Sequence, residues 1–92
     1  MTLDKAIELG EYDPEFLKQF EEFTRLPRYS QFLLIQKALR NRRRQLQLHW
    51  ADLNNQLDFS RKPELKPALK SVQNQIEYLN DEEERLLIEY ST

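Results

Sequence analysis

Residues 29–58 read YSQFLLIQKALRNRRRQLQLHWADLNNQLD, and this stretch decides the fold. Side chains suited to a helix interface recur along it at alternating spacings of three and four residues, a pattern we call the seam. Its positions are Phe32, Gln36, Leu39, Arg43, Leu46, Trp50, Leu53 and Leu57. The pattern indicates a long helix that packs along its whole length against a second helix.

The last third of the chain carries a matching seam. Its positions are Leu65, Leu69, Val72, Ile76, Leu79, Glu83, Leu86 and Tyr90. If the chain folds back with a turn near residue 61, the two seams meet position by position, and the residue numbers of every pair add up to 122. The sequence therefore predicts an all-α fold built on a long antiparallel, coiled-coil-like hairpin with arms at 29–58 and 63–90, each roughly 40 Å long.

The start of the second arm has two alternatives. If the helix begins at Pro63, Pro67 lacks a backbone N–H inside the helix and bends its axis. If it begins near Lys66, Pro67 is a well-suited first residue and Leu65 precedes the helix. Leu65 fits the layer opposite Leu57, which favours the early start with a kink.

The N-terminal region predicts two short amphipathic helices, at 2–9 and 14–25. Thr2 is suited to cap the first helix, and Gly10 is suited to end it. Pro14 is suited to the first position of the second helix. We expect both helices to pack on the open end of the hairpin, because a two-helix hairpin of this size is marginally stable alone.

Aromatic residues follow helical spacing in this region, and we interpret them as core residues rather than as a binding strip. Three apolar side chains of the hairpin lie off the seam near its open end, and the short helices are expected to cover them. The aromatic residues are Tyr12, Phe16, Phe20 and Phe23, and the residues to be covered are Leu33, Leu34 and Ile88.

The composition excludes several classes of protein. At 92 residues the chain has room for one domain, 1–92. It contains no cysteine, which rules out disulfides and thiolate chemistry. No apolar run approaches the roughly 18 residues of a membrane span, and the N-terminus lacks a basic-then-apolar signal. We therefore expect a cytoplasmic protein that does not contact a membrane.

The charge alternates along the chain. The balance is −4 over residues 1–26, +6 over 27–62 and −4 over 63–92. In the predicted register residues 38–44, which contain the basic block at 40–44, lie opposite residues 78–84, which contain the acidic run at 81–84. Arg43 and Glu83 both occupy the seam, so we expect them to form a structural ion pair that fixes the register more than it adds stability.

Three basic residues of the long helix point away from the seam. They are Lys37, Arg40 and Arg44, and the facing helix cannot fully reach them, because adjacent helix residues are rotated by about 100°. Glu21 and Glu22 of the second short helix are candidates to neutralise part of this stripe, and Arg28 is a candidate to extend it. An outward basic stripe is able to bind phosphate groups.

Two exposed apolar residues are candidates for a docking surface or a dimer contact. Leu48 points straight away from the seam, and Tyr78 projects outward from the second arm. The long stem of Arg44 would complete such a surface. A single exposed leucine is ordinary, so the hypothesis rests on the combination.

The sequence provides no candidate for catalysis, for a cofactor or for a metal. Neighbouring carboxylates at 81–84 fan out around a helix axis instead of sharing one face. His49 is the only histidine, and no serine or cysteine lies near it in the sequence. We interpret both features as ordinary solvated helix positions.

These observations favour a non-catalytic helical interaction module, an adaptor or a small subunit that binds another protein. The alternative is an RNA- or ribosome-associated protein that contacts phosphates through the outward basic stripe. Against the alternative stand the acidic net charge of −2 and the lack of exposed aromatic residues beside the stripe. Both a monomer and a homodimer are compatible with the pattern.

Overall fold

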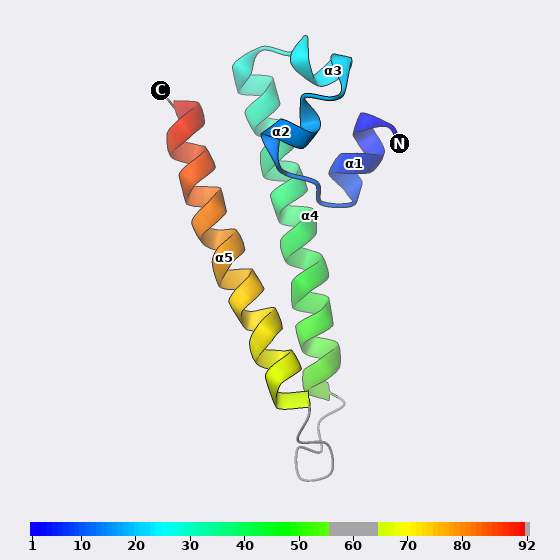
Figure 1. Cartoon of the computed structure of the whole chain (residues 1–92), viewed down its shortest axis with the longest axis vertical. Helices are drawn as coiled ribbons and strands as arrows, with labels where there is room; N and C mark the ends of the chain where they lie inside the picture. The colour runs from blue at the N-terminus through cyan, green and yellow to red at the C-terminus, as the bar shows by residue number, and fades with distance from the viewer. Residues whose placement is uncertain (56–64, 92) are drawn as a thin grey trace.

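The computed structural model describes residues 1–55 and 65–91. These residues form helices and contain no strand. The helices are α1 (Leu3–Glu8), α2 (Pro14–Leu17), α3 (Glu21–Thr24), α4 (Arg28–Asn55) and α5 (Leu65–Ser91). Figure 1 shows α4 and α5 side by side and running in opposite directions, with α1–α3 gathered near the start of α4. The all-α prediction is confirmed for the described residues.

Contacts between α4 and α5 fit the expected register at two levels. At the open end, the rings of Phe32 and Tyr90 stack with their centroids 5.9 Å apart. Near the middle, Arg43 Nε donates a hydrogen bond to Asn80 Oδ1 at 3.2 Å. The seam residues Leu39 and Leu86 lie between these levels and are both fully buried, so the two arms share a buried contact line there.

The predicted turn and the predicted start of the second arm at Pro63 lie outside the described residues, and so does the layer at Leu57. Within the description α5 begins at Leu65. Pro67 therefore stands in the first described turn, where backbone N–H groups have no partner inside the helix.

The first short helix forms as the sequence predicts. Thr2 Oγ1 accepts a hydrogen bond from the backbone N–H of Lys5 at 3.1 Å, which caps α1. Gly10 follows the helix with φ at +84°, a backbone conformation that side chains with a Cβ rarely adopt. The chain can therefore reverse direction immediately after α1.

The predicted single helix at 14–25 is wrong, because the structure divides this segment into α2 and α3. Phe20 interrupts it with an extended backbone, at φ −93° and ψ 118°. Leu17 and Phe23 are both fully buried. In one continuous helix these two side chains would point about 120° apart, so the interruption allows both to enter the same core.

The core lies at the open end of the hairpin. Its buried residues come from α1–α3 and from the facing parts of the long helices: Leu3, Ala6, Ile7, Leu17, Phe23, Ile35, Ala38, Leu39, Leu79 and Leu86. Tyr12, Phe16 and Phe20 pack against this cluster, which confirms their interpretation as core residues.

The short helices cover only one of the three side chains that were expected to need cover. Leu34 packs against the core, whereas Leu33 remains 45% exposed and Ile88 62% exposed. The expectation fails for the latter two because α1–α3 occupy a single flank of the hairpin, and Leu33 and Leu34 lie on opposite flanks of α4.

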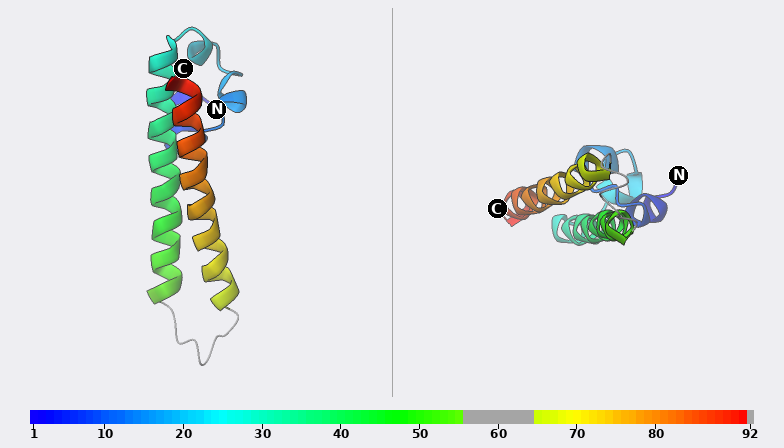
Figure 2. Two further views of the ribbon diagram at one scale, coloured as in Figure 1. Left: turned by 90° about the vertical axis from the view of Figure 1, so that its left-hand side faces the viewer. Right: turned by 90° about the horizontal axis from the view of Figure 1, so that it is seen from below.

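The molecule is long and thin, with extents of 53 × 28 × 16 Å and a Cα radius of gyration of 16.1 Å. A compact chain of this length would have a radius of about 12 Å. Figure 2 shows that the hairpin continues well beyond α1–α3 as two helices alone. Along that part Trp50, Leu69 and Ile76 are only half-buried. None of the described helices has the length and apolar character needed to cross a membrane.

Candidate interaction surface

One flank of α4 is occupied by α1. Three α4 side chains donate hydrogen bonds to backbone carbonyls at and just after the end of α1, where carbonyls lack the partners of the helix interior; Ile7 O also accepts a hydrogen bond from the N–H of Gly10. These bonds are Asn41 Nδ2 to Ile7 O (3.0 Å), Arg42 Nε to Gly10 O (3.3 Å) and Gln45 Nε2 to Leu9 O (3.2 Å). Helical periodicity alone does not reveal these contacts, although the lone glycine lies where the two backbones approach closely.

Two arginines of the basic block make internal contacts. Arg42 lies 3.5 Å from a carboxylate oxygen of Glu11. Arg43 donates a hydrogen bond to the carboxylate of Glu83 and another to Asn80. The Arg43–Glu83 ion pair is the one that the register predicts, and it joins α4 to α5 across the seam.

Lys37, Arg40 and Arg44 are exposed, as the helical spacing predicts. Among the residues that the structure describes, none of the three forms an ion pair. Glu21, a candidate to neutralise them, instead pairs with Arg25, the residue that follows α3. The outward basic stripe therefore keeps its charge.

Arg28 does not extend the stripe. Its guanidinium donates a hydrogen bond to the backbone carbonyl of Glu89 at 2.6 Å. It also lies 4.7 Å from the centre of the Tyr90 ring, close enough for a cation–π contact. Arg28 thus ties the start of α4 to the end of α5.

Tyr78 belongs to a polar cluster beside α2. Together with Tyr12 it lines a hollow of about 310 Å³. Glu82 has a pKa below its usual value, chiefly because Arg85 donates a hydrogen bond to it at 2.7 Å, with a smaller contribution from the Tyr78 hydroxyl. Burial, followed by the charge of Glu82, raises the pKa of Tyr12. Tyr78 is 61% exposed, and it is tied to this flank.

Leu48 is 64% exposed on α4, one turn after Arg44. It lines none of the hollows that contain Tyr78. By helical rotation it points away from α5 altogether. The structure therefore does not bring Leu48 and Tyr78 together into one surface. Leu48 projects away from α5, whereas Tyr78 projects from α5 toward the flank that holds α1–α3.

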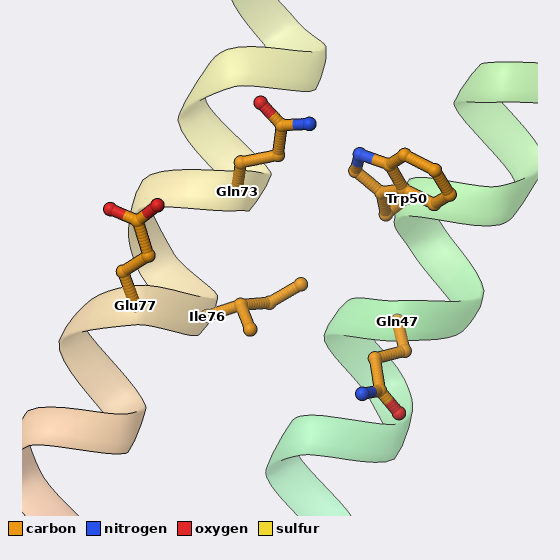
Figure 3. A pocket seen from close by; sticks show the side chains of 5 residues that line it. All are labelled: Gln47, Trp50, Gln73, Ile76 and Glu77. Atoms are coloured by element: carbon orange, nitrogen blue, oxygen red, sulfur yellow. The ribbon is translucent and has the colours of Figure 1, made fainter.

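The flank of the hairpin opposite α1–α3 is uncovered. It contains a groove of about 360 Å³ between α4 and α5, lined by Gln47, Trp50, Gln73, Ile76 and Glu77 (Figure 3). Helical rotation places further residues on the same flank. We call this flank the uncovered face and define it by Tyr29, Leu33, Arg40, Arg44, Trp50, Ile76, Glu77, Glu84 and Leu87.

Trp50 is the largest side chain of the groove. Its position at the seam follows the prediction, and Val72, its expected partner, is 4% exposed. The indole Nε1 is buried and has no hydrogen-bond partner among the residues that the structure describes. Figure 3 shows the amide of Gln73 across the groove from the indole. A buried donor without a partner is uncommon, which makes this groove a polar as well as an apolar feature.

The described residues contain no group of three or more histidine, aspartate or glutamate side chains able to hold a metal ion. His49 is exposed on α4. Comparison of the chain with protein-family models, with curated proteins and with solved structures finds no match.

Proposed function

We propose that this chain is a non-catalytic helical interaction module, an adaptor or small subunit, which binds a protein partner through the uncovered face. The observation that carries the proposal is the one-sided core. Packing of α1–α3 covers one flank of the hairpin at its open end, whereas Leu33 and Leu87 on the other flank remain 45% and 47% exposed. Apolar side chains that lie together and are flanked by charges are typical of protein–protein interfaces.

The proposal includes the finer architecture, a coiled-coil-like hairpin with the short helices on its open end. The stacking of Phe32 on Tyr90 and the pairing of Arg43 with Glu83 support the register. A rigid pair of helices presents side chains at fixed spacing, which suits recognition of another helical surface. We assign the chain no reaction and no cofactor.

A second candidate function is RNA or ribosome association. The specific observation in its favour is the unneutralised stripe of Lys37, Arg40 and Arg44. Phosphate contacts through these residues would make binding fall steeply with salt. The acidic side chains of Glu77 and Glu84 on the same face weigh against a polyanion.

Affinity capture from native lysate, with and without RNase, tests the proposal. The test compares variants of two adjacent residues that lie on different sides of α5. Leu87→Glu alters the uncovered face, whereas Ile88→Glu alters the outer side of α5. Both residues are exposed and apolar, at 47% and 62%, so both variants should fold. We expect capture of a discrete protein to be lost with Leu87→Glu, retained with Ile88→Glu and unaffected by RNase.

Two other outcomes would contradict the proposal. Loss of capture with Leu48→Glu or Tyr78→Ala, but not with Leu87→Glu, would move the interface away from the uncovered face. Capture that disappears with RNase and with the double variant Arg40→Glu/Arg44→Glu would support RNA association instead. Circular dichroism of each variant confirms that the helices remain folded.

A further inference from the structure

The uncovered face carries charges of opposite sign on its two helices. Its α4 edge holds Arg40 and Arg44, and its α5 edge holds Glu77 and Glu84. All four side chains are exposed, and none of them forms an ion pair with another residue in the described part of the chain. One basic edge and one acidic edge therefore lie side by side without internal neutralisation.

The two charged edges lie at the same level along the hairpin. The stacked rings of Phe32 and Tyr90 indicate that residues of α4 and α5 are level when their numbers add up to about 122. Arg44 is then nearly level with Glu77, and Arg40 with Glu84. The mismatch is about two residues at most, or roughly 3 Å along a helix.

A second copy of the chain complements this pattern. Rotation by 180° about an axis parallel to the hairpin places α4 of each copy on α5 of the other, and it keeps every residue at its own level. Arg40 and Arg44 of one copy then face Glu84 and Glu77 of the other. Two-fold symmetry forms this set of contacts twice.

The apolar residues of the face match under the same rotation. Leu33 and Leu87 are nearly level, so Leu33 of each copy contacts Leu87 of the other. Toward the opposite end, the groove beside Trp50 is closed by the same groove of the partner. The short helices do not obstruct this approach because they pack on the other flank.

The other two-fold arrangement is unfavourable. An axis perpendicular to the hairpin would place α4 on α4, with the basic residues near the middle of both helices. Arg40 and Arg44 of one copy would then lie against the same residues of the other. Like charges opposed across an interface cost free energy, so the charge pattern selects the parallel axis.

We infer that the uncovered face binds a second copy of this chain about a two-fold axis parallel to the hairpin, which closes a four-helix bundle. The inference rests on the proposed function, because it names the partner of the same face. With 28 residues α4 is about 42 Å long, and two adjacent helices are about 20 Å wide. The resulting footprint of about 800 Å² per copy is that of a standard stable interface.

Sedimentation equilibrium of the full chain tests this inference. We expect a species of twice the monomer mass of 11.2 kDa. Because its charge pairs are exposed, the dimer should weaken as salt rises from about 0.05 to 0.5 M. The double variant Arg40→Glu/Arg44→Glu should raise the dimer Kd roughly 30- to 100-fold, since four attractive contacts become repulsive. Leu48→Glu, on the outer side of α4, is the matched control and should leave the Kd unchanged.

A charge exchange tests the orientation. Chains with Arg40→Glu/Arg44→Glu and chains with Glu77→Arg/Glu84→Arg should each be monomeric alone and should form a heterodimer when mixed. A chain with all four reversals should dimerise again, because its edges are complementary once more. If the wild type dimerises and either double variant dimerises alone equally tightly, α4 does not lie on α5 of the other copy and the proposed axis is wrong.

The failure of this inference can be separated from failure of the proposed function. A wild-type chain that stays monomeric at about 200 µM overturns the inference. If that monomer still captures a protein through Leu87, the interaction module stands and only the identity of the partner is wrong. If it captures RNA through Arg40 and Arg44, both the second copy and the protein partner are wrong.

Discussion

Neighbouring arginines of the basic block make different contacts because each helix residue is rotated by about 100° from the one before it. Arg42 is turned toward the end of α1, where it approaches Glu11 and Gly10. Arg43 is turned toward α5 and binds Glu83. Arg44 is exposed and forms no ion pair with any residue that the structure describes. A run of like charges therefore has to be interpreted residue by residue.

Reversing Arg43 should destabilise the fold, whereas reversing Lys70 should not. Arg43→Glu places a carboxylate beside Glu83, whose side chain is 36% exposed, and we expect unfolding by urea to show a loss of about 1–2 kcal/mol. Lys70→Glu, at an exposed position of α5 outside the uncovered face, should change the stability by less than about 0.5 kcal/mol. The exchange Arg43→Glu/Glu83→Arg should recover part of the loss. An unchanged melting temperature for Arg43→Glu would show that the hairpin register is wrong.

At the scale of elements, α4 is the helix that the others share. It contacts α5 along the seam and holds the end of α1 through its side chains. It also reaches α3, because Gln31 Nε2 donates a hydrogen bond to the carbonyl of Phe23 at 2.9 Å. α1–α3 are too short to be stable alone, so their structure depends on this attachment.

Gly10 is the position at which the attachment of α1 is most sensitive. A Cβ added there would lie 3.0 Å from the backbone of Arg42, and the φ of +84° is strained for any residue with a side chain. Gly10→Ala should therefore lower the free energy of unfolding by about 2 kcal/mol or more. Hydrogen exchange should show loss of protection in α1 before any loss in α5.

Glu8→Ala is the matched control for this prediction. Glu8 is exposed near the end of the same helix, and its substitution should change stability by less than about 0.5 kcal/mol. If Gly10→Ala proved as stable as the wild type, α1 would not approach α4 as closely as described.

At the scale of the whole molecule, one flank of the hairpin is packed and the other is not. The packed flank holds the buried core cluster near the open end. The other flank holds the groove at Trp50 and the charged edges of both helices. This asymmetry is what makes the uncovered face available to a partner.

Stability should fall in alkaline solution because tyrosines are partly buried on the packed side. Burial, followed by nearby acidic charge, raises the pKa of Tyr12 and of Tyr90 above the usual value near 10. The folded state holds these protons more tightly than the unfolded state. The contribution of these two tyrosines to the free energy of unfolding is therefore complete below about pH 10, and it is lost as the pH rises through their pKa in the folded state.

Urea unfolding between about pH 8 and pH 11 measures this effect. Tyr12→Phe should reduce the loss of stability above pH 10, with Tyr90 accounting for part of the remainder. Tyr29→Phe, at a position that is 71% exposed, is the control and should keep the wild-type slope. A steeper loss in Tyr12→Phe would contradict the assignment.

The sequence by itself determined the all-α class, the two long helices and the polarity of their individual faces. These follow from local chemistry, because the spacing of three and four residues, the cap at Thr2 and the helical rotation act within a few turns. The outward direction of Lys37, Arg40 and Arg44 could be predicted for the same reason.

Only the tertiary structure decided which flank of the hairpin is covered. The sequence could not predict the interruption at Phe20, because it depends on Leu17 and Phe23 entering one core. Nor could it separate Leu33 from Leu34, since both are apolar and only the docking of α1–α3 distinguishes their flanks. Helical periodicity specifies which side chains share a face, but the choice of what packs against that face is made by contacts between residues far apart in the chain.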